Sequence, residues 1–227
     1  MNVQALLAAG CRILAYHGHA CGLAGQVTCC DSDGQLWTLP LGLGLDEAEP
    51  GNVIGFDHDL RGIGTRAVPN PATRFHLAIY ERRPDVKAIV HTHPPALAAL
   101  SMLGRCLPIA HMDDCLFFDD CGYLPQWPGV PVGDEEGQVI SQALGDHSCA
   151  LLAGHGYVAT GSSLELAIYR AVHFEHAAAR ALRALAVGEP VELKHDVAAQ
   201  ARDFLLQPSI VQSTFDYWQR QSAGSGR

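Results

Sequence analysis

The chain has 227 residues, of which 48% are hydrophobic and 17% are charged. This composition is typical of a globular protein and argues against extensive disorder, and the length suits a single α/β domain. The 24 acidic residues outnumber the 15 basic ones and give a net charge of −9, with no run of five basic residues. Nucleic acid and anionic membrane surfaces are therefore not expected partners.

The eight cysteines form neither a disulfide framework nor a CxxC motif, and Cys29 and Cys30 are adjacent. The apolar N-terminal stretch has no positively charged leader region, and no apolar run approaches the roughly 18 residues of a membrane span. We therefore expect an amphipathic N-terminal helix, reduced and mostly buried cysteines, and a cytoplasmic protein.

The first half of the chain reads as strands and hairpins separated by helices. The elements predicted there are a helix at 3–16, strands at 24–29, 36–39 and 52–56, a short strand after the turn DHDLRG, a helix at 72–83, a strand at 87–92 and a helix at 95–103. The Asp-Gly within CDSDGQ marks the turn of the first hairpin.

The second half begins with an irregular stretch and ends in helices. The elements predicted there are a strand at 107–110, an irregular segment at 112–133, a helix at 134–144, strands at 148–153 and 156–160, a helix at 162–187, a helical tail at 193–206 and a frayed end, QSAGSGR. Strands outnumber those of a simple βα alternation. We expect an α/β fold, a three-layer sandwich whose central, mostly antiparallel or mixed sheet is covered by helices, in one domain over 1–227 with a helical tail at roughly 190–227.

Two histidines follow an apolar run in AIVHTHPPAL. His91 and His93 are two residues apart in a predicted strand, so their side chains share a face and can converge on one ion. Catalytic zinc usually takes three protein ligands, and His155 in ALLAGHGYVATG is the third candidate. Glycines on both sides of it suggest a close backbone approach. Alternatively, each histidine is simply satisfied by hydrogen bonds.

The order and spacing of RPDVKAIVHTHPPA, GHG and a following G-x-S-x-E-x-A helix start resemble the class II aldolase/adducin family over residues 3–187. The resemblance implies a class II aldolase-like fold and a divalent metal held by His91, His93 and His155. Zn²⁺ is expected there, with Mn²⁺, Fe²⁺, Ni²⁺ or Co²⁺ as alternatives. It also implies a homo-oligomer, a tetramer in the related enzymes, with sites at the subunit interfaces.

The chain departs from the family's aldolases around this site. The aldolases' catalytic glutamate aligns with Ala72, so that carboxylate is absent. Positions aligned with the phosphate cradle have lost their hydroxyls, and Gly25, Gln26, Gly42 and Asn70 are the candidate substrate-binding residues there. The aldolase tyrosine after the histidine aligned with His111 is replaced by Met112. The resemblance therefore implies an unphosphorylated substrate.

Replacement acid/base groups are few. His76 and Arg74 lie just beyond Ala72 and are the candidate catalytic residues, although surface or capping bonds explain them equally well. His17 and His19 precede the altered cradle and are candidates for lining the pocket, while a polar loop is the plainer interpretation.

The remaining polar and aromatic candidates have ordinary structural explanations. Aspartates 113, 114, 119 and 120 suit turns, and Glu135 and Glu136 suit the start of a helix, where acids complement the helix dipole. Aromatic residues at 117, 118, 123 and 127 either contact a substrate ring or belong to the core.

The sequence thus predicts a metal-dependent carbon–carbon lyase that acts on a small unphosphorylated hydroxy-carbonyl or hydroxyaromatic acid. By the resemblance, the metal stabilises an enediolate or enolate, which aldol cleavage and decarboxylation share. Loss of the glutamate weakens the aldolase mechanism more than decarboxylation, which needs no base at the carbon that loses CO₂. The alternative is an adducin-like, non-catalytic binding or oligomerisation module.

Overall fold

Seven strands form one mixed sheet in the order β3-β2-β1-β4-β7-β6-β5. The computed structural model describes residues 2–127, 129 and 134–224. The strands are β1 (Gln26–Cys30), β2 (Leu36–Thr38), β3 (Ile54–Phe56), β4 (Ala88–Thr92), β5 (Cys121–Leu124), β6 (Cys149–Leu152) and β7 (Gly156–Gly161). Neighbouring strands are antiparallel except β5 and β6, which run parallel. The prediction of a mostly antiparallel, mixed sheet is confirmed.

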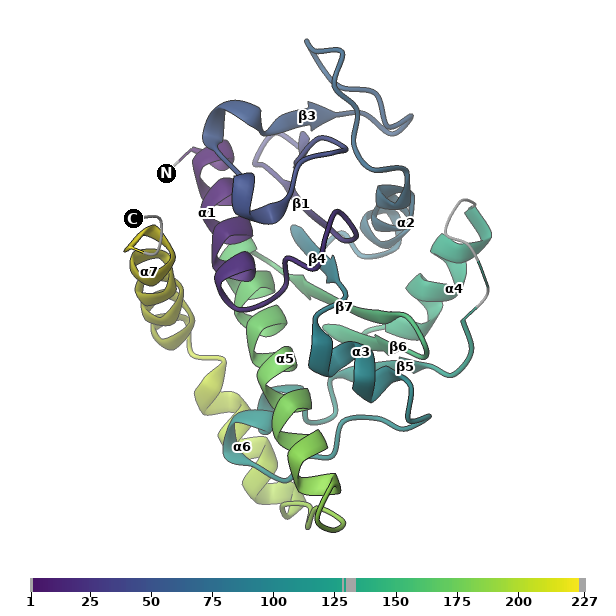
Figure 1. Ribbon diagram of the computed structural model, residues 1–227, viewed down its shortest axis with the longest axis vertical. Helices are drawn as coiled ribbons and strands as arrows, with labels where there is room; N and C mark the ends of the chain where they lie inside the picture. Colours follow the sequence, from purple (N-terminus) through teal and green to yellow (C-terminus); the bar gives the residue numbers. More distant parts are fainter. Residues whose placement is uncertain (1, 128, 130–133, 225–227) are drawn as a thin grey trace.

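Helices cover both faces of this sheet (Figure 1). The α-helices are α1 (Val3–Tyr16), α2 (Arg74–Arg82), α3 (Pro95–Ser101), α4 (Asp134–Leu144), α5 (Leu164–Leu185), α6 (His195–Leu205) and α7 (Pro208–Gly224). Within the described residues, short 3₁₀ helices lie at Leu45–Glu47, Pro50–Asn52, Pro71–Thr73 and Met112–Phe117.

The alternation of side chains along β4 separates the two helical layers. Ala88 and Val90 join the core that contains α1 and α5, whereas Ile89 packs with Phe75 of α2 and Ile140 of α4. This follows from the two-residue period of a strand. The molecule is therefore a three-layer sandwich, as predicted from the sequence.

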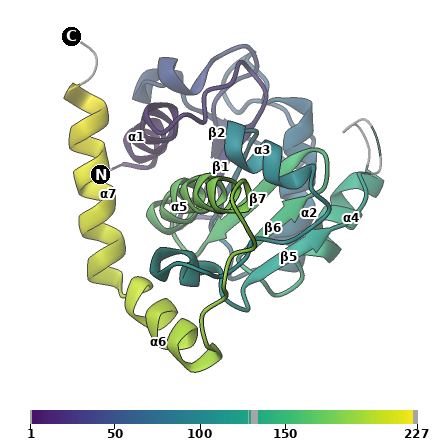
Figure 2. The ribbon, with the colours of Figure 1, turned by 60° about the horizontal axis from the view of Figure 1, so that its bottom comes forward.

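The helical tail contains a second helix beyond the one predicted at 193–206. The helix expected at 193–206 is confirmed as α6, but α7 follows it and includes residues 221–224, which were expected to fray. Val211, Phe215 and Trp218 recur at helical spacing and are buried in the core that contains α1 and α5, which explains the extra helix. Figure 2 shows α6 and α7 along one side of the molecule. Residues 225–227 of the expected frayed end lie outside the described residues.

Three strand predictions were wrong. Residues 107–110 form no strand, because the carbonyl of Ile109 accepts a hydrogen bond from the N–H of Leu193 and not from the sheet. Part of the segment expected to be irregular forms the edge strand β5 instead. The short strand expected after DHDLRG is reduced to one bridge between Phe56 and Gly62.

Two further features concern the cysteines and the helices. All eight cysteines are free thiols, and Cys11, Cys29, Cys115 and Cys149 are buried. Within the described residues, no helix combines the length and apolar character needed to cross a membrane.

Candidate metal centre

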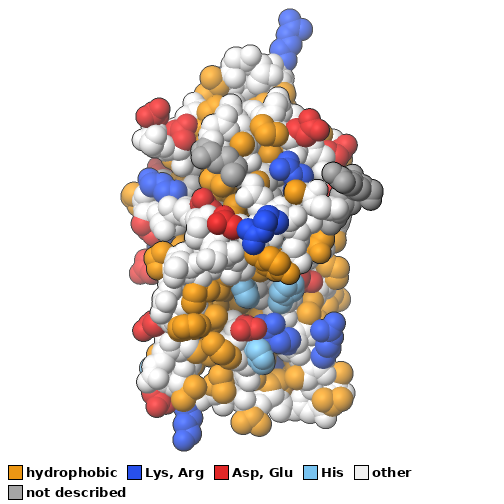
Figure 3. Space-filling model, turned by 90° about the vertical axis from the view of Figure 1, so that its left-hand side faces the viewer, with side chains coloured by type: hydrophobic (Ala, Val, Ile, Leu, Met, Phe, Trp, Pro, Cys, Tyr) orange, Lys and Arg blue, Asp and Glu red, His pale blue; other side chains and the backbone are white. Residues whose placement is uncertain are grey.

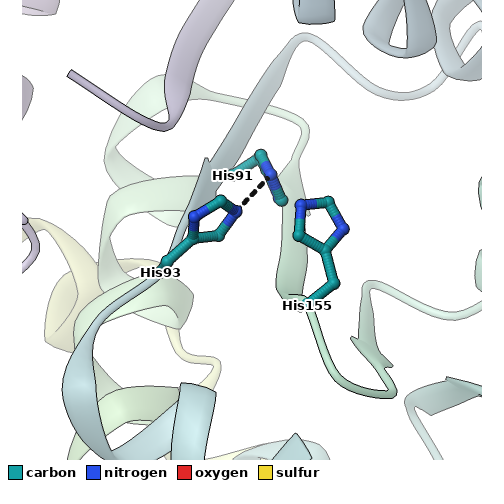
Figure 4. A group of neighbouring side chains, drawn as sticks. All are labelled: His91, His93 and His155. Carbon is teal, nitrogen blue, oxygen red and sulfur yellow. Dashed lines mark hydrogen bonds between the residues drawn. The ribbon is translucent and has the colours of Figure 1, made fainter. Parts of the chain in front are cut away.

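Three histidines meet where β4 ends and the β6–β7 turn begins (Figure 4). His91 lies on β4 and, by the strand alternation, faces the α2–α4 layer, where its ring lies 5.1 Å from the ring of Phe75. His93 follows the strand, and His155 lies in the turn between β6 and β7. One ligand atom from each histidine can be chosen so that all three lie within 4.8 Å of one another.

The backbone of β7 fixes the orientation of His91. Its Nδ1 lies 2.7 Å from the carbonyl oxygen of Tyr157, so Nδ1–H donates and the lone pair is left on Nε2. That Nε2 lies 3.0 Å from Nε2 of His93, as the dashed line in Figure 4 marks. Two imidazole nitrogens therefore point at the same small volume.

His93 and His155 are held by close packing. A Cβ added at Gly156 would lie 2.8 Å from Cδ2 of His93 and 2.9 Å from the carbonyl oxygen of Thr92, so only glycine fits there. The close approach expected around GHG is thus present. The ring of His155 packs on the ring of Trp127 with a centroid distance of 3.8 Å.

The three imidazoles are neutral at neutral pH. Burial, followed by the charges of His155 and His93, lowers the pKa of His91 well below its usual value. Burial also lowers the pKa of His93, and burial together with His93 lowers the pKa of His155 to about 4. Neutral imidazoles are the form that binds a transition metal, so the convergent lone pairs fit a divalent ion.

A buried hydrogen-bonded group lies on the opposite face of β4. Oγ1 of Thr92 is 2.8 Å from Nδ1 of His19 and 3.0 Å from the hydroxyl of Tyr157, and that hydroxyl is 3.2 Å from Nδ1 of His19. All three side chains are fully buried. Tyr157 thus joins this group by its hydroxyl and binds His91 by its carbonyl. Sequence reasoning singled out His19 as a candidate pocket residue but missed Thr92 and Tyr157. Thr92, the middle residue of HTH, was the one signal in the sequence.

A buried carboxylate anchors the helix that follows His93. Both oxygens of Glu175 on α5 accept hydrogen bonds from the α3 backbone, from the N–H of Ala96 and the N–H of Leu97, each at 2.8 Å. These N–H groups are unpaired donors of the first turn, where a negative charge is favoured. Sequence reasoning missed Glu175, although an acid within an apolar helical stretch was a signal.

The histidines open into a cavity of about 180 Å³. It is lined by Ala24, Gly25, Gln26, Asn70, Ala72, Phe75, His91, His93 and His155. Three of the predicted substrate-binding residues, Gly25, Gln26 and Asn70, are therefore in place. Gly42 instead lines an adjoining narrow crevice that shares Ala24, Gly25, Gln26 and Asn70 with the cavity. These described lining residues include no lysine, arginine or carboxylate.

The two predicted catalytic residues lie away from this cavity. His76 is fully buried behind Phe75, and its Nδ1 lies 2.8 Å from Oγ1 of Thr28. Arg74 lines a different cavity of about 680 Å³ between α2, α4 and the β1–β2 hairpin. A catalytic role for either residue stays a prediction.

The aspartates near His111 make structural contacts. Asp114 accepts hydrogen bonds from Arg180 at 2.6 and 3.1 Å, and Asp120 accepts one from the N–H of Ser148 at 2.7 Å. Of the four aromatic candidates, Trp127 contacts a histidine of the site, whereas Phe117 packs in the main core.

Known proteins are similar to this chain in sequence and fold. Residues 5–182 match the model of the class II aldolase and adducin N-terminal domain. The decarboxylase NovR of Streptomyces niveus is 32% identical over 181 residues, covering 78% of this chain and 67% of that protein. A 5-methylthioribulose-1-phosphate/5-deoxyribulose-1-phosphate aldolase of Rhodospirillum rubrum is 33% identical over 175 residues, covering 77% of this chain and 78% of the relative.

A solved structure agrees with the sequence matches. The L-fuculose 1-phosphate aldolase from Glaciozyma antarctica PI12 superposes with a TM-score of 0.88 at 25% identity, covering 97% of this chain and 88% of that one. The fold, the histidine motifs and the matched length lead to one conclusion: the chain belongs to the class II aldolase and adducin N-terminal domain family.

Proposed function

We propose that the protein is a metal-dependent carbon–carbon lyase that acts on a small unphosphorylated hydroxy-carbonyl or hydroxyaromatic acid. The observation that carries this proposal is the convergence of His91, His93 and His155 on a cavity of about 180 Å³. A divalent ion bound there supplies Lewis-acid polarisation of a substrate oxygen. Family membership and the lyase names of two relatives support the reaction class.

The cavity's other residues select the substrate. The side-chain amides of Gln26 and Asn70 offer hydrogen bonds to substrate oxygens, while Ala24, Ala72 and Phe75 present apolar surface. A phosphate group would need cationic or clustered N–H donors, and the described lining residues include no lysine or arginine. A small, unphosphorylated substrate fits this lining better than a sugar phosphate.

Decarboxylation is the version that the lining favours. Ala72, in the 3₁₀ helix before α2, leaves this wall of the cavity without a carboxylate that could act as a base. Loss of CO₂ requires an electron sink and later a proton donor, but no base at the carbon that loses CO₂. The relative named as a decarboxylase supports this choice, and aldol cleavage stays the second version of the same activity.

The remaining parts of the proposal follow the sequence prediction and the family. Zn²⁺ is the proposed ion because it suits three imidazoles, with Mn²⁺, Fe²⁺, Ni²⁺ or Co²⁺ as alternatives. The protein is proposed to be a cytoplasmic, single-domain homotetramer. A solution mass equal to one chain of 24.3 kDa would contradict the oligomer.

Metal analysis and a product assay test the function together. Purified, unchelated protein should carry about one divalent ion per chain. It should release CO₂ or an aldehyde from at least one member of a panel of β-keto acids, hydroxyaromatic acids and hydroxy-carbonyls. Protein that carries well under one ion per chain, and takes up neither Zn²⁺ nor Mn²⁺, would instead support an adducin-like module.

A further inference from the structure

A second cavity, of about 680 Å³, lies between α2, α4 and the β1–β2 hairpin. Small-molecule pockets measure about 300–1,000 Å³, so its volume suits a ligand. No described residue lines both this second cavity and the histidine cavity. Figure 1 shows α4 beside α2 on the same side of the sheet. The second cavity is therefore a candidate binding site separate from the metal centre.

One face of α2 forms a wall of the second cavity. The α2 residues that line it include Arg74, Leu77, Ala78 and Glu81. Their spacing of three and four residues places them on the same side of the helix. Phe75, the neighbour of Arg74, lines the histidine cavity instead. The two cavities thus lie against different sides of α2.

Buried apolar side chains form the floor of the second cavity. Leu36 of β2 and Leu77 of α2 belong to one core cluster, and Val86, just before β4, is buried as well. Tyr80 also lines the cavity, but its hydroxyl lies 2.8 Å from Oγ1 of Thr28 and is already hydrogen-bonded. This floor offers apolar contact to the body of a ligand.

The rim of the second cavity has a positive net charge. Arg74 and Lys87 are its bases, and Glu81 is the acid among its described lining residues. Lys87 forms no ion pair with any described residue, because Arg83 binds the nearby carboxylate of Asp85 through hydrogen bonds of 2.8 and 2.9 Å. A positive lining in a chain of net charge −9 favours an anionic ligand.

The strand pairing brings Lys87 to the edge of the apolar floor. Its carbonyl accepts a hydrogen bond of 2.8 Å from the N–H of Cys30, which also lines the cavity. The two-residue period of a strand places Lys87 on the same face as Ile89, which packs in the layer of α2 and α4. Burial raises the pKa of the Cys30 thiol, and the positive charge of Lys87 opposes this rise. A cation and an apolar surface are therefore adjacent.

We propose that the second cavity binds a small organic carboxylate with an apolar body. The body lies on Leu36, Leu77 and Val86, and the carboxylate forms an ion pair with Lys87. Burial of the apolar body supplies most of the affinity, and the charged contact selects an acid over a neutral molecule of the same shape. This site is separate from the metal centre and does not depend on the proposed lyase function.

Three probe ligands test the two features of this site. Octanoate has both an apolar chain and a carboxylate, octan-1-ol has the chain alone, and acetate has the carboxylate alone. Isothermal titration of the purified protein should show octanoate binding about tenfold more tightly than octan-1-ol, and no measurable binding of acetate. Equal affinities for octanoate and octan-1-ol, or no binding of octanoate, would overturn the proposal.

Charge reversal shows where the carboxylate binds. Lys87→Glu should weaken octanoate binding about tenfold, because repulsion replaces attraction, and should leave octan-1-ol affinity unchanged. Lys194→Glu, which reverses the other lysine of the chain at an exposed position, is the matched control and should bind octanoate as the wild type does. His155→Ala should also bind octanoate normally, since no metal ion holds the ligand. Wild-type affinity in Lys87→Glu, or a loss in His155→Ala, would contradict the site.

Chemical protection locates the ligand without any substitution. Cys30 lines the second cavity, whereas Cys21 is exposed and lies outside its lining. Saturating octanoate should slow alkylation of Cys30 by iodoacetamide severalfold and leave alkylation of Cys21 unchanged, as peptide mass mapping would show. Unchanged alkylation of Cys30 would overturn the proposal. A protein that binds octanoate in this way but takes up no Zn²⁺ would contradict the lyase function and support the second cavity as an independent site.

Discussion

Two groups of histidines lie on opposite sides of the sheet, and their geometries differ. The site histidines are His91, His93 and His155. The helical histidines are His17, which caps α1, and His173 and His176 of α5. Rings of the second group contact Trp218 of α7, with centroid distances of 4.9 Å from His17 and 5.5 Å from His173. Figure 3, which views the side carrying α7, shows histidine side chains among hydrophobic ones.

The difference between the groups is the direction of the ring nitrogens. A backbone carbonyl turns Nε2 of His91 toward His93, and all three site histidines open into a cavity. The helical histidines are partly buried, and the rings of His17 and His173 instead pack on Trp218, with His173 also on Tyr169. Among the described residues, the site histidines bring three ligand atoms within 4.8 Å. A group of histidines becomes a metal-site candidate through convergent lone pairs, and proximity alone is insufficient.

The largest expected effect separates the two groups directly. His155→Ala should weaken Zn²⁺ binding more than about 100-fold, because a three-ligand site is reduced to two ligands. The matched variant His173→Ala removes a helical histidine and should leave Zn²⁺ affinity within about twofold of the wild type. Isothermal titration of chelator-stripped protein measures both. Equal losses of Zn²⁺ affinity in the two variants would contradict the proposal that the site histidines, and not the helical histidines, bind the metal.

One residue links the two regions, and its removal should cost stability. Glu175 lies on α5 between His173 and His176, and it holds the first turn of α3, just beyond His93. Glu175→Ala should lower the free energy of unfolding by about 2 kcal/mol, since two charge-assisted hydrogen bonds are lost and the buried N–H of Leu97 is left without its partner. Urea denaturation measures this loss.

Measuring the Zn²⁺ affinity of Glu175→Ala shows whether Glu175 also affects the site. If Glu175 acts only through folding, the natively folded Glu175→Ala protein should bind Zn²⁺ with nearly wild-type affinity. A large loss of affinity without loss of stability would mean that α3 orients His93 directly.

Much of this site could be predicted from the chain because its signals are local. The two-residue period of a strand places His91 and His93 together, and the glycine beside His155 indicates the close approach that Gly156 makes. The carbonyl of Tyr157 could not be predicted, because it depends on the pairing of β4 with β7. Trp127 comes from a segment that carries only turn signals, so nothing local places its ring beside His155.

The fold shows the same division between local and non-local causes. Alternation and capping predicted most helices and the hairpin. The edge strand β5 was missed because its pairing with β6 is between segments more than twenty residues apart. A strand was predicted at 107–110 from the sequence alone, and Leu107 is indeed buried there. The hydrogen-bond partner of this stretch is the backbone N–H of Leu193, more than eighty residues further along the chain, and local patterns do not indicate it.

A smaller effect is expected from the hydroxyl of Tyr157. Tyr157→Phe keeps the ring and the carbonyl that binds His91, but it removes the hydroxyl bonded to Thr92 and His19. Loss of such a supporting contact should weaken Zn²⁺ binding about tenfold. Tyr169→Phe is the matched control, because that hydroxyl bonds the carbonyl of Leu205 among the tail helices. Similar Zn²⁺ affinity in both variants would show that the buried group does not support the site.

The smallest expected effect concerns acid pH and the helical histidines. Burial is the main cause that lowers the pKa of His17 and of His173, each to about 4. Both rings are neutral in the folded state, so their contribution to stability is full above pH 6.5 and is lost as pH falls through that value toward 4. The charged and titratable groups that act on His173 are His176, Asp113, Arg180 and His17.

A single aromatic replacement tests that contribution. His173→Phe keeps a ring against Trp218 but cannot take up a proton, so its loss of stability between pH 7.5 and pH 5 should be smaller than the wild type's by up to about 1 kcal/mol. Urea denaturation at the two pH values measures the difference, and His58→Phe, at an exposed histidine, is the control. Zn²⁺ affinity at pH 7.5 should stay unchanged in His173→Phe, because its ring belongs to the hydrophobic packing around α7 and not to the cavity. Identical pH dependence in His173→Phe and wild type would mean that the helical histidines take up protons as readily when folded as when unfolded, and their burial would then carry no cost in acid.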